Sequence, residues 1–323
     1  MSRATRSRQA GRTLIELMVS MALGLMILAG VGSLYLTANQ SARVSGSVAS
    51  VEESGQIALS LMGASVRRAG FAEIAGTNST ARFNLLFAGP HLRGCNGGLD
   101  FANAADADPD NADFACSAAP VAGRVGDALA VAYQADSVLA AAQAASLDCV
   151  GNAPANRPIA PAFAAAVPGG QVPIVQNVYF LQADGNLMCM GNGNPGQPQP
   201  LMNGVEDFRV FYGFDRALYL LAGGTGAPPS ASSLLTAADI NALAPIGGLT
   251  PWDFVVSVQV CLLIRTQEQG TSLGGNFTPC PADVAQAMNP TLITPVALPA
   301  DGALRRAYTQ VFTVRSRASQ SPS

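Results

Sequence analysis

The sequence predicts an α+β fold in which one long N-terminal α-helix packs on a globular head made of antiparallel β-sheet and long loops. Three observations predict it. An uncharged apolar run lies near the N-terminus, a helical pattern with one apolar face follows it, and alternating apolar strands occupy the C-terminal half. With 323 residues the chain can bury a sizeable core.

The apolar run has the length of a membrane-spanning helix. Leu17 to Leu36 are 20 consecutive uncharged residues, which at 1.5 Å per residue span about 30 Å. The run is too long for an ordinary secretory signal, and no small-residue cleavage site closes it. Arg3, Arg6 and Arg8 precede it without any acidic residue, so this flank is expected to stay cytoplasmic. A plain N-terminal anchor is the alternative reading.

The helix is expected to continue beyond the lipid-spanning part. Apolar residues recur at three- and four-residue steps up to Val66, with a gap at Gly55, while Glu52, Glu53 and other polar residues fall off this stripe. Arg67, Arg68 and Gly70 are suitable residues for a helix C-terminus. We therefore predict a helix over 12–68, with 17–36 in the membrane, followed by a β-rich head over 69–323 on the side opposite the basic flank.

The strands of the head follow a two-residue period. Val178–Leu181 and Leu187–Met190 flank Asp184-Gly185, a strong hairpin turn. In a later strand the even-numbered residues Val256 to Ile264 form one apolar face. Two further strands are predicted, one around 208–212 and a last one over 308–314.

The six cysteines lie downstream of the apolar run, which suits an oxidising compartment and three disulfides in the head. They are Cys95, Cys116, Cys149, Cys189, Cys261 and Cys280. The spacing allows many pairings. We favour Cys261–Cys280, because the segment between them leaves a strand and can return beside it. Buried free thiols are the alternative.

Several classes of function are disfavoured by composition. The formal charge of −3 and the pI near 5.1 argue against nucleic acid as a partner. His91 is the only histidine; it has no nucleophile nearby in sequence and is expected in a loop or on the surface. A calcium loop at Asp106, Asp108 and Asp110 is a weak candidate, because it lacks the central glycine and the final glutamate. A solvated acidic loop is the preferred reading. We expect no cofactor and no enzymatic activity.

The N-terminus resembles the class III signal of type IV pilins. A short basic leader ends at Gly11, and "RTLIELMVS" places Glu16 five residues further on. The resemblance implies that a prepilin peptidase removes a leader over 1–11 by cutting after Gly11, and methylates the new N-terminus at Arg12, where the family usually has an apolar residue. It implies in addition that 17–36 forms the fibre core after assembly and that the head over 69–323 is periplasmic before it. It also implies that Glu16 offsets the terminal ammonium of a neighbouring subunit. Such a pair is far stronger in a low dielectric than in water.

Further segments resemble PilW-type minor pilins. They are "SARVSGSVASVEESGQIALSLMGASVRRAGF", "QPLMNGVEDFRVFYGFD", "WDFVVSVQVCLLIRT" and "RRAYTQVFTVRSR". The resemblance implies a structural subunit of a type IV pilus that primes assembly and sits at or near the fibre tip. The implied partners are other minor pilins, the major pilin, the inner-membrane assembly machinery and a tip adhesin, with twitching motility and cell adhesion as the processes served.

The resemblance also implies a location: the inner membrane, crossed once, with the head in the periplasm, and then the fibre at the cell surface. Two alternatives to a pilus subunit remain open from the sequence. One is a minor pseudopilin of a type II secretion system, which shares the leader, the glutamate and the helix. The other is a membrane-anchored periplasmic enzyme or binding protein.

The leader predicts a defined processing event. In cells with an active prepilin peptidase, N-terminal sequencing of the membrane-extracted protein is expected to begin at Arg12. Gly11→Leu is expected to retain Met1, since the peptidase needs the small residue before the cut. Retention of Met1 in the unmodified chain contradicts the pilin-type signal.

Overall fold

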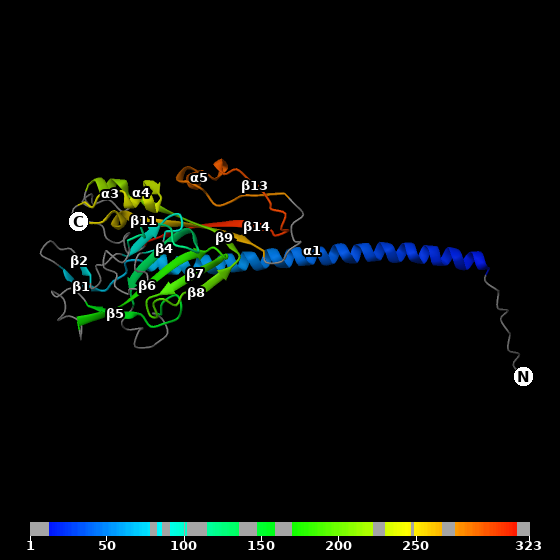
Figure 1. Cartoon of the computed structure of the whole chain (residues 1–323), viewed down its shortest axis with the longest axis horizontal. Coiled ribbons are helices and arrows are strands. Elements are labelled where there is room, and N and C mark those ends of the chain that lie inside the picture. The colour runs from blue at the N-terminus through cyan, green and yellow to red at the C-terminus, as the bar shows by residue number, and fades with distance from the viewer. Residues whose placement is uncertain are drawn as a thin grey trace, which may run out of the picture.

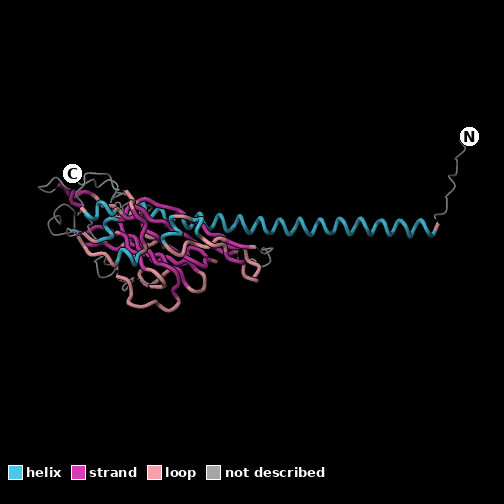
Figure 2. Tube along the Cα trace, turned by 90° about the horizontal axis from the view of Figure 1, so that it is seen from above, coloured by secondary structure: helices cyan, strands magenta, loops and turns pink. Residues whose placement is uncertain are grey.

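The computed structural model describes residues 13–77, 83–85, 91–99, 101, 115–135, 147–158, 170–221, 230–246, 249–266 and 275–314. One long helix, α1, extends well beyond a head in which the strands are gathered (Figure 1). Figure 2 shows the same arrangement from above, with the helix entering the head at one end. The predicted combination of a long N-terminal helix and an antiparallel β-rich head is confirmed.

The helix α1 spans Leu14–Arg68, about 80 Å at 1.5 Å per residue. Its burial is confined to the second half, where the buried side chains include Val51, Ala58, Met62 and Val66. The helix ends where the sequence indicated, because Gly70 adopts a positive φ of 70° and its N–H donates to the carbonyl oxygen of Ala132 at 2.9 Å. A left-handed residue of this kind commonly ends a helix.

Two antiparallel sheets form the head. The larger has the order β3-β4-β6-β7-β8, with β5 pairing to β6, and the smaller has the order β10-β9-β11-β14. The larger sheet consists of β3 (Leu92–Cys95), β4 (Arg124–Gln134), β5 (Ala155–Pro158), β6 (Gln171–Gln182), β7 (Asn186–Gly191) and β8 (Gln199–Asn203). The smaller consists of β9 (Val205–Phe214), β10 (Ser233–Leu235), β11 (Val255–Arg265) and β14 (Arg305–Thr313).

Short elements connect and cover these sheets. Two small two-stranded sheets pair β1 (Ile74–Thr77) with β2 (Phe83–Leu85) and β12 (Asn276–Phe277) with β13 (Val296–Ala297). The short helices are α3 (Arg216–Leu220), α4 (Ala237–Asn241), α5 (Val284–Met288), η3 (Pro251–Phe254) and η4 (Pro290–Leu292).

The apolar interior is divided into three clusters. The largest lies where α1 meets both sheets and includes Met62, Leu129, Tyr179, Phe208 and Val260. A second cluster lies on the opposite face of the larger sheet, and a third, small one on the outer face of β11. The larger sheet is therefore buried on both faces, which explains why β4 and β6 read as nearly continuous apolar runs.

The predicted hairpin is confirmed, and the predicted apolar face of β11 is confirmed from Val258 to Ile264 and corrected at Val256. Leu181 pairs with Leu187 across the turn at Gly185, whose φ is 86°. In β11, however, Val255 is fully buried and Val256 only half-buried. The register shifts between Val255 and Ser257, and a bulge of this kind moves the side chains before it to the other face.

Two glycines let α1 approach the smaller sheet closely. A Cβ on Gly55 would lie 2.9 Å from Ile264 Cδ1, and one on Gly63 would overlap the aromatic ring of Phe312. Gly55, which looked like a gap in the apolar stripe, is thus part of the contact. The same interface is bridged at its edge by an ion pair between Glu52 of α1 and Arg306 of β14.

A buried polar group joins α1 to the larger sheet. The hydroxyls of Ser65 and Tyr179 lie 2.8 Å apart, and the side-chain amide of Asn177 donates to the Ser65 hydroxyl at 3.1 Å. Burial raises the pKa of the Tyr179 hydroxyl, so this group stays protonated. These bonds satisfy polar atoms inside the apolar interface, where an unpaired group is costly.

A buried carboxylate joins the two sheets. Asp127 of β4 accepts hydrogen bonds from the backbone N–H of Val210 in β9 at 2.9 Å and from the side-chain amide of Asn96 at 3.0 Å. Burial raises the pKa of its carboxyl group. Asp127 lies where β4 shifts register between Val125 and Ala128, so the bulge turns this side chain towards the second sheet.

Because Gly63 lies so close to the smaller sheet, adding a methyl group there is expected to lower stability more than adding one at Gly46. Gly63→Ala is expected to destabilise the protein by about 1–3 kcal/mol, because the buried ring of Phe312 has to move. Gly46→Ala is the matched control: nothing lies within 4 Å of its Cβ position, and alanine favours the helix by about 1 kcal/mol. Chemical denaturation of both variants measures the difference. Equal effects of the two changes contradict the tight contact.

Candidate functional site

The first half of α1 presents an apolar surface with no partner in the described chain. Every large apolar side chain from Leu14 to Leu36 is at least 51 % exposed. By length and composition this stretch can cross a membrane, and none of its most apolar 18 residues is buried. An apolar surface of this extent needs lipid or other protein segments around it.

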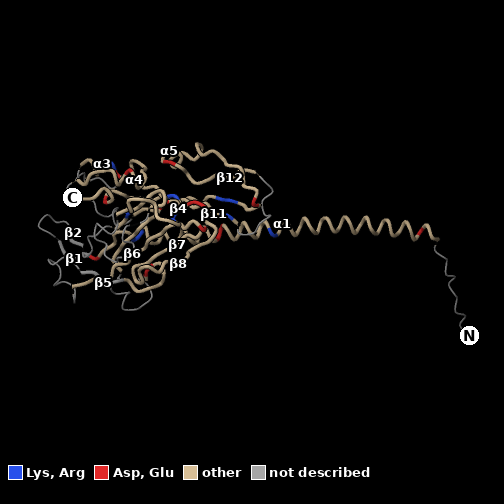
Figure 3. Tube along the Cα trace, in the orientation of Figure 1, with Lys and Arg blue, Asp and Glu red and all other residues tan. Residues whose placement is uncertain are grey.

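Glu16 is the only charged residue of α1 before Arg43. Figure 3 shows one acidic position near the start of an otherwise uncharged helical segment. The side chain of Thr13, the N-cap residue, accepts the backbone N–H of Glu16 at 3.4 Å. Thr13 and Glu16 have the threonine-x-x-glutamate spacing of a helix start, a sequence signal that locates this cap. The carboxylate is exposed in the first helical turn, where the helix dipole favours a negative charge.

The expected processing residues, Gly11 and Arg12, lie outside the described residues. Their roles and the pairing of Glu16 with a terminal ammonium stay predictions. The position of Glu16 on the helix is defined, whereas its partner would come from another chain.

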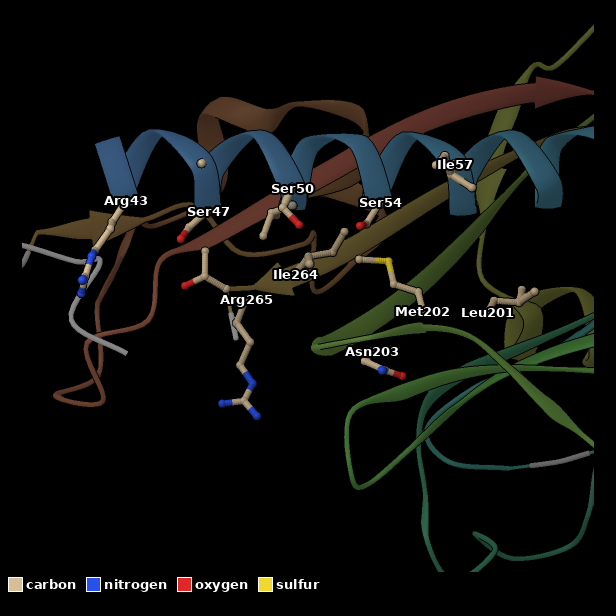
Figure 4. Close-up of a pocket in the computed structure, with 13 residues that line it drawn as sticks. Arg43, Ser47, Ser50, Ser54, Ile57, Leu201, Met202, Asn203, Ile264 and Arg265 are labelled. Carbon is tan, nitrogen blue, oxygen red and sulfur yellow. The ribbon is translucent and has the colours of Figure 1, made fainter. Parts of the chain in front are cut away.

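A groove opens where α1 enters the head (Figure 4). Its volume is about 680 Å³. Small residues of α1 form one wall, while β8 and the end of β11 form the other. Arg43 and Arg265 lie at the end nearest the exposed half of the helix, and Ile57 and Leu201 at the opposite end (Figure 4). The lining residues from α1 include Gly46, Ser47, Ser50 and Ser54, and those from the sheets include Met202, Asn203 and Ile264.

A charged cluster stabilises the head beside this groove. The buried guanidinium of Arg305 forms paired hydrogen bonds with Glu206, at 2.6 and 2.8 Å, and with Asp301, at 2.6 and 3.0 Å. These bonds lower the pKa of Asp301 and raise that of Arg305. Arg265, at the groove, lies 3.7 Å from Glu206. The cluster joins the start of β14 to β9 and to the end of β11.

All six cysteines form disulfides: Cys95–Cys116, Cys149–Cys189 and Cys261–Cys280. The last is the pair favoured from the sequence. Each bond joins one strand cysteine, in β3, β7 or β11, to a cysteine outside the strands, and each belongs to a different apolar cluster. The disulfides therefore fix three loops to the three parts of the interior, and no thiol remains free as a nucleophile.

His91 lies outside the strands, directly before β3, but the expectation of a surface position was wrong. Its side chain is only 2 % exposed, with Nδ1 3.8 Å from Asp253 Oδ1. The calcium candidates Asp106, Asp108 and Asp110 lie outside the described residues. Among the residues that are described, no group of three or more histidine, cysteine or acidic side chains could hold a metal ion.

Sequence reasoning missed the residues that position α1 on the head. Ser65 and Asn177 are polar residues that lie in largely apolar segments, a pattern that indicates a buried hydrogen bond without identifying its partner. A glycine inside a helix, as at Gly55 and Gly63, likewise indicates a close contact without identifying the partner. Their partners lie more than 100 residues away in the chain.

Two family models match parts of this chain. Residues 178–316 match the family described as Type IV Pilus-assembly protein W, and residues 6–32 match the prokaryotic N-terminal methylation motif. No curated protein matches the chain. Among solved structures, a type IV-like pilin from Thermus thermophilus (TTHA1219) is similar, with 12% identity and a TM-score of 0.40, covering 81% of this chain and 94% of that one.

Proposed function

We propose that this chain, a type IV pilin-like protein of the PilW family, is a non-catalytic minor pilin that helps to prime assembly of a type IV pilus at or near the fibre tip. It first resides in the inner membrane with its head in the periplasm and then joins the fibre. Its partners are other minor pilins, the major pilin, the inner-membrane assembly machinery and a tip adhesin. A prepilin peptidase removes residues 1–11.

The observation that supports this proposal best is the exposed apolar half of α1 with one carboxylate at its start. A helix that only anchored a protein in lipid would gain nothing from Glu16, since a charge near the hydrocarbon costs free energy. A carboxylate is useful when a second chain brings a cation to it. The methylation motif over residues 6–32 covers this position.

The groove beside α1 supports a second contact between subunits. Small residues on a helix allow another helix to approach closely, and Gly46, Ser47, Ser50 and Ser54 provide such a surface along the groove. The groove begins at Arg43 of α1, on the same helix as the exposed apolar segment that ends at Leu36. We infer that a neighbouring subunit in the fibre packs here.

A pilus is favoured over a secretion pseudopilus by the match of residues 178–316 to the PilW family model. This segment spans the C-terminal part of β6, from Val178 to Gln182, and all later strands of the larger and smaller sheets. The leader, Glu16 and the long helix do not separate the two systems, because both are expected to contain them.

Replacing Glu16 tests the assembly role. Glu16→Gln preserves the size of the side chain and removes its charge, so membrane insertion and leader removal are expected to persist. Incorporation into surface pili is expected to fall by about tenfold or more, because a buried cation left without its partner is strongly destabilising. Immunoblots of sheared pili from a strain lacking the native copy measure the loss.

Glu16→Asp is the matched control, since it retains the charge and is expected to recover part of the incorporation. Equal incorporation of the glutamine variant and the unmodified protein contradicts the proposed function. Loss of the glutamine variant from the membrane fraction indicates an anchoring role and contradicts it as well.

Filling the groove tests the second contact separately. Ser50 is exposed and lines the groove, so Ser50→Trp is expected to change the free energy of unfolding by only about 0.5 kcal/mol while lowering incorporation into pili. Ser60→Trp is the control, at an exposed position of α1 outside the groove lining. Normal incorporation of Ser50→Trp contradicts packing of a subunit in the groove.

A further inference from the structure

A second, smaller pocket lies at the end of the head remote from the exposed half of α1. It is lined by Arg93 of β3, by Asn241 at the end of α4, by Trp252 of η3, and by aliphatic and proline residues around them. Figure 1 places α4 at the far end of the head from the N-terminal part of the helix. The pocket shares no lining residue with the groove beside α1.

Among the residues that the structure describes, Arg93 has no acidic partner. Its guanidinium carbon lies 5.9 Å from the centre of the Trp252 ring. Its Nε is buried and has no hydrogen-bond partner, and Arg93 forms no ion pair with the residues that the structure describes. Burial lowers the pKa of this guanidinium. A partly desolvated charge without a partner is unfavourable unless an anion is present for at least part of the time.

The neighbouring acidic residue is engaged elsewhere. Asp253 Oδ2 accepts hydrogen bonds from the backbone N–H and the hydroxyl of Thr250, at 2.8 and 2.9 Å. Its other oxygen lies 3.8 Å from His91 Nδ1. The carboxylate therefore caps η3 instead of neutralising Arg93.

The walls of the pocket are held in place. The indole N–H of Trp252 donates to the side-chain oxygen of Asn241 at 2.9 Å, and its ring packs edge-on against Tyr212 at 4.9 Å between centres. The pocket volume, about 360 Å³, is at the small end of the range for ligand sites. This volume can accommodate an acidic side chain together with part of the peptide backbone that carries it.

We propose that this pocket binds the carboxylate of an acidic side chain on a neighbouring protein, with Arg93 as the charged partner. Arginine presents a planar set of donors that binds a carboxylate through two parallel hydrogen bonds, and the apolar walls accommodate the stem of a glutamate. The location at the end remote from the membrane-spanning half suits a partner beyond the head. This inference does not depend on the proposed pilus function, since it concerns a different surface.

Trp252 makes the pocket directly observable, because it is the only tryptophan in the chain. The full-length protein in detergent micelles is titrated with acetyl-Gly-Glu-Gly-amide while tryptophan emission is recorded, and acetyl-Gly-Gln-Gly-amide is the neutral control. A saturable change is expected with the glutamate peptide alone, since neutralising the cation beside the ring alters the field at the indole. Sodium acetate is expected to give a weaker change of the same sign.

Two variants assign the effect to Arg93. Arg93→Gln is expected to weaken binding of the glutamate peptide by about tenfold or more, as for loss of a charge-assisted hydrogen bond. Arg216→Gln, an exposed position in α3 outside the pocket lining, is expected to bind as the unmodified protein does. Far-UV circular dichroism checks that both variants are folded.

Three results would overturn the proposal. The first is equal binding of the glutamate and glutamine peptides, and the second is unchanged binding by Arg93→Gln. The third concerns the aspartates at 106, 108, 110 and 113, which precede Cys116 in the sequence. If replacing all four by asparagine reproduces the emission change of Arg93→Gln without peptide, the occupant is this chain's own acidic segment and not a partner.

Discussion

The contact between the second half of α1 and the two sheets is the constraint on which the rest of the head depends. Its apolar part is built from Met62 and Val66 against residues such as Val260 and Phe312, and the glycines at 55 and 63 set how closely the helix lies. Its polar part is the Ser65, Tyr179 and Asn177 group. Because both sheets share this one cluster with the helix, neither can shift without disturbing the other.

The same helix therefore has two surroundings along its length. From about Val51 onward it is part of a protein interior, and before Leu36 its apolar side chains are open on all sides. Charged residues are distributed in the same way (Figure 3). The segment before Leu36 contains Glu16 alone, whereas the ion pairs lie in the head. One continuous helix spans the boundary between these two environments.

Covalent and ionic contacts attach several described loops of the head to its strands. Each disulfide attaches one loop to one strand of a different cluster, and closing such loops stabilises a protein by about 3 kcal/mol each on the chain-entropy estimate. Arg305 performs a similar function beside the groove by joining β14 to Glu206 and Asp301. Arg93 differs from Arg305, because it lies at the remote end of the head and has no acidic partner among the described residues.

Local patterns in the sequence were enough to determine the helix, its apolar first half, the hairpin at Gly185, the oxidised cysteines and the exceptional position of Glu16. These features depend on neighbours within a few residues, or on composition, and the sequence states both directly. Only the tertiary structure decided the burial of His91, the bulge that turns Val255 inward, the two disulfides other than Cys261–Cys280, and the close contacts of Gly55 and Gly63. Each of these depends on a residue distant in sequence, and a single sequence does not specify which distant side chain packs against a given position.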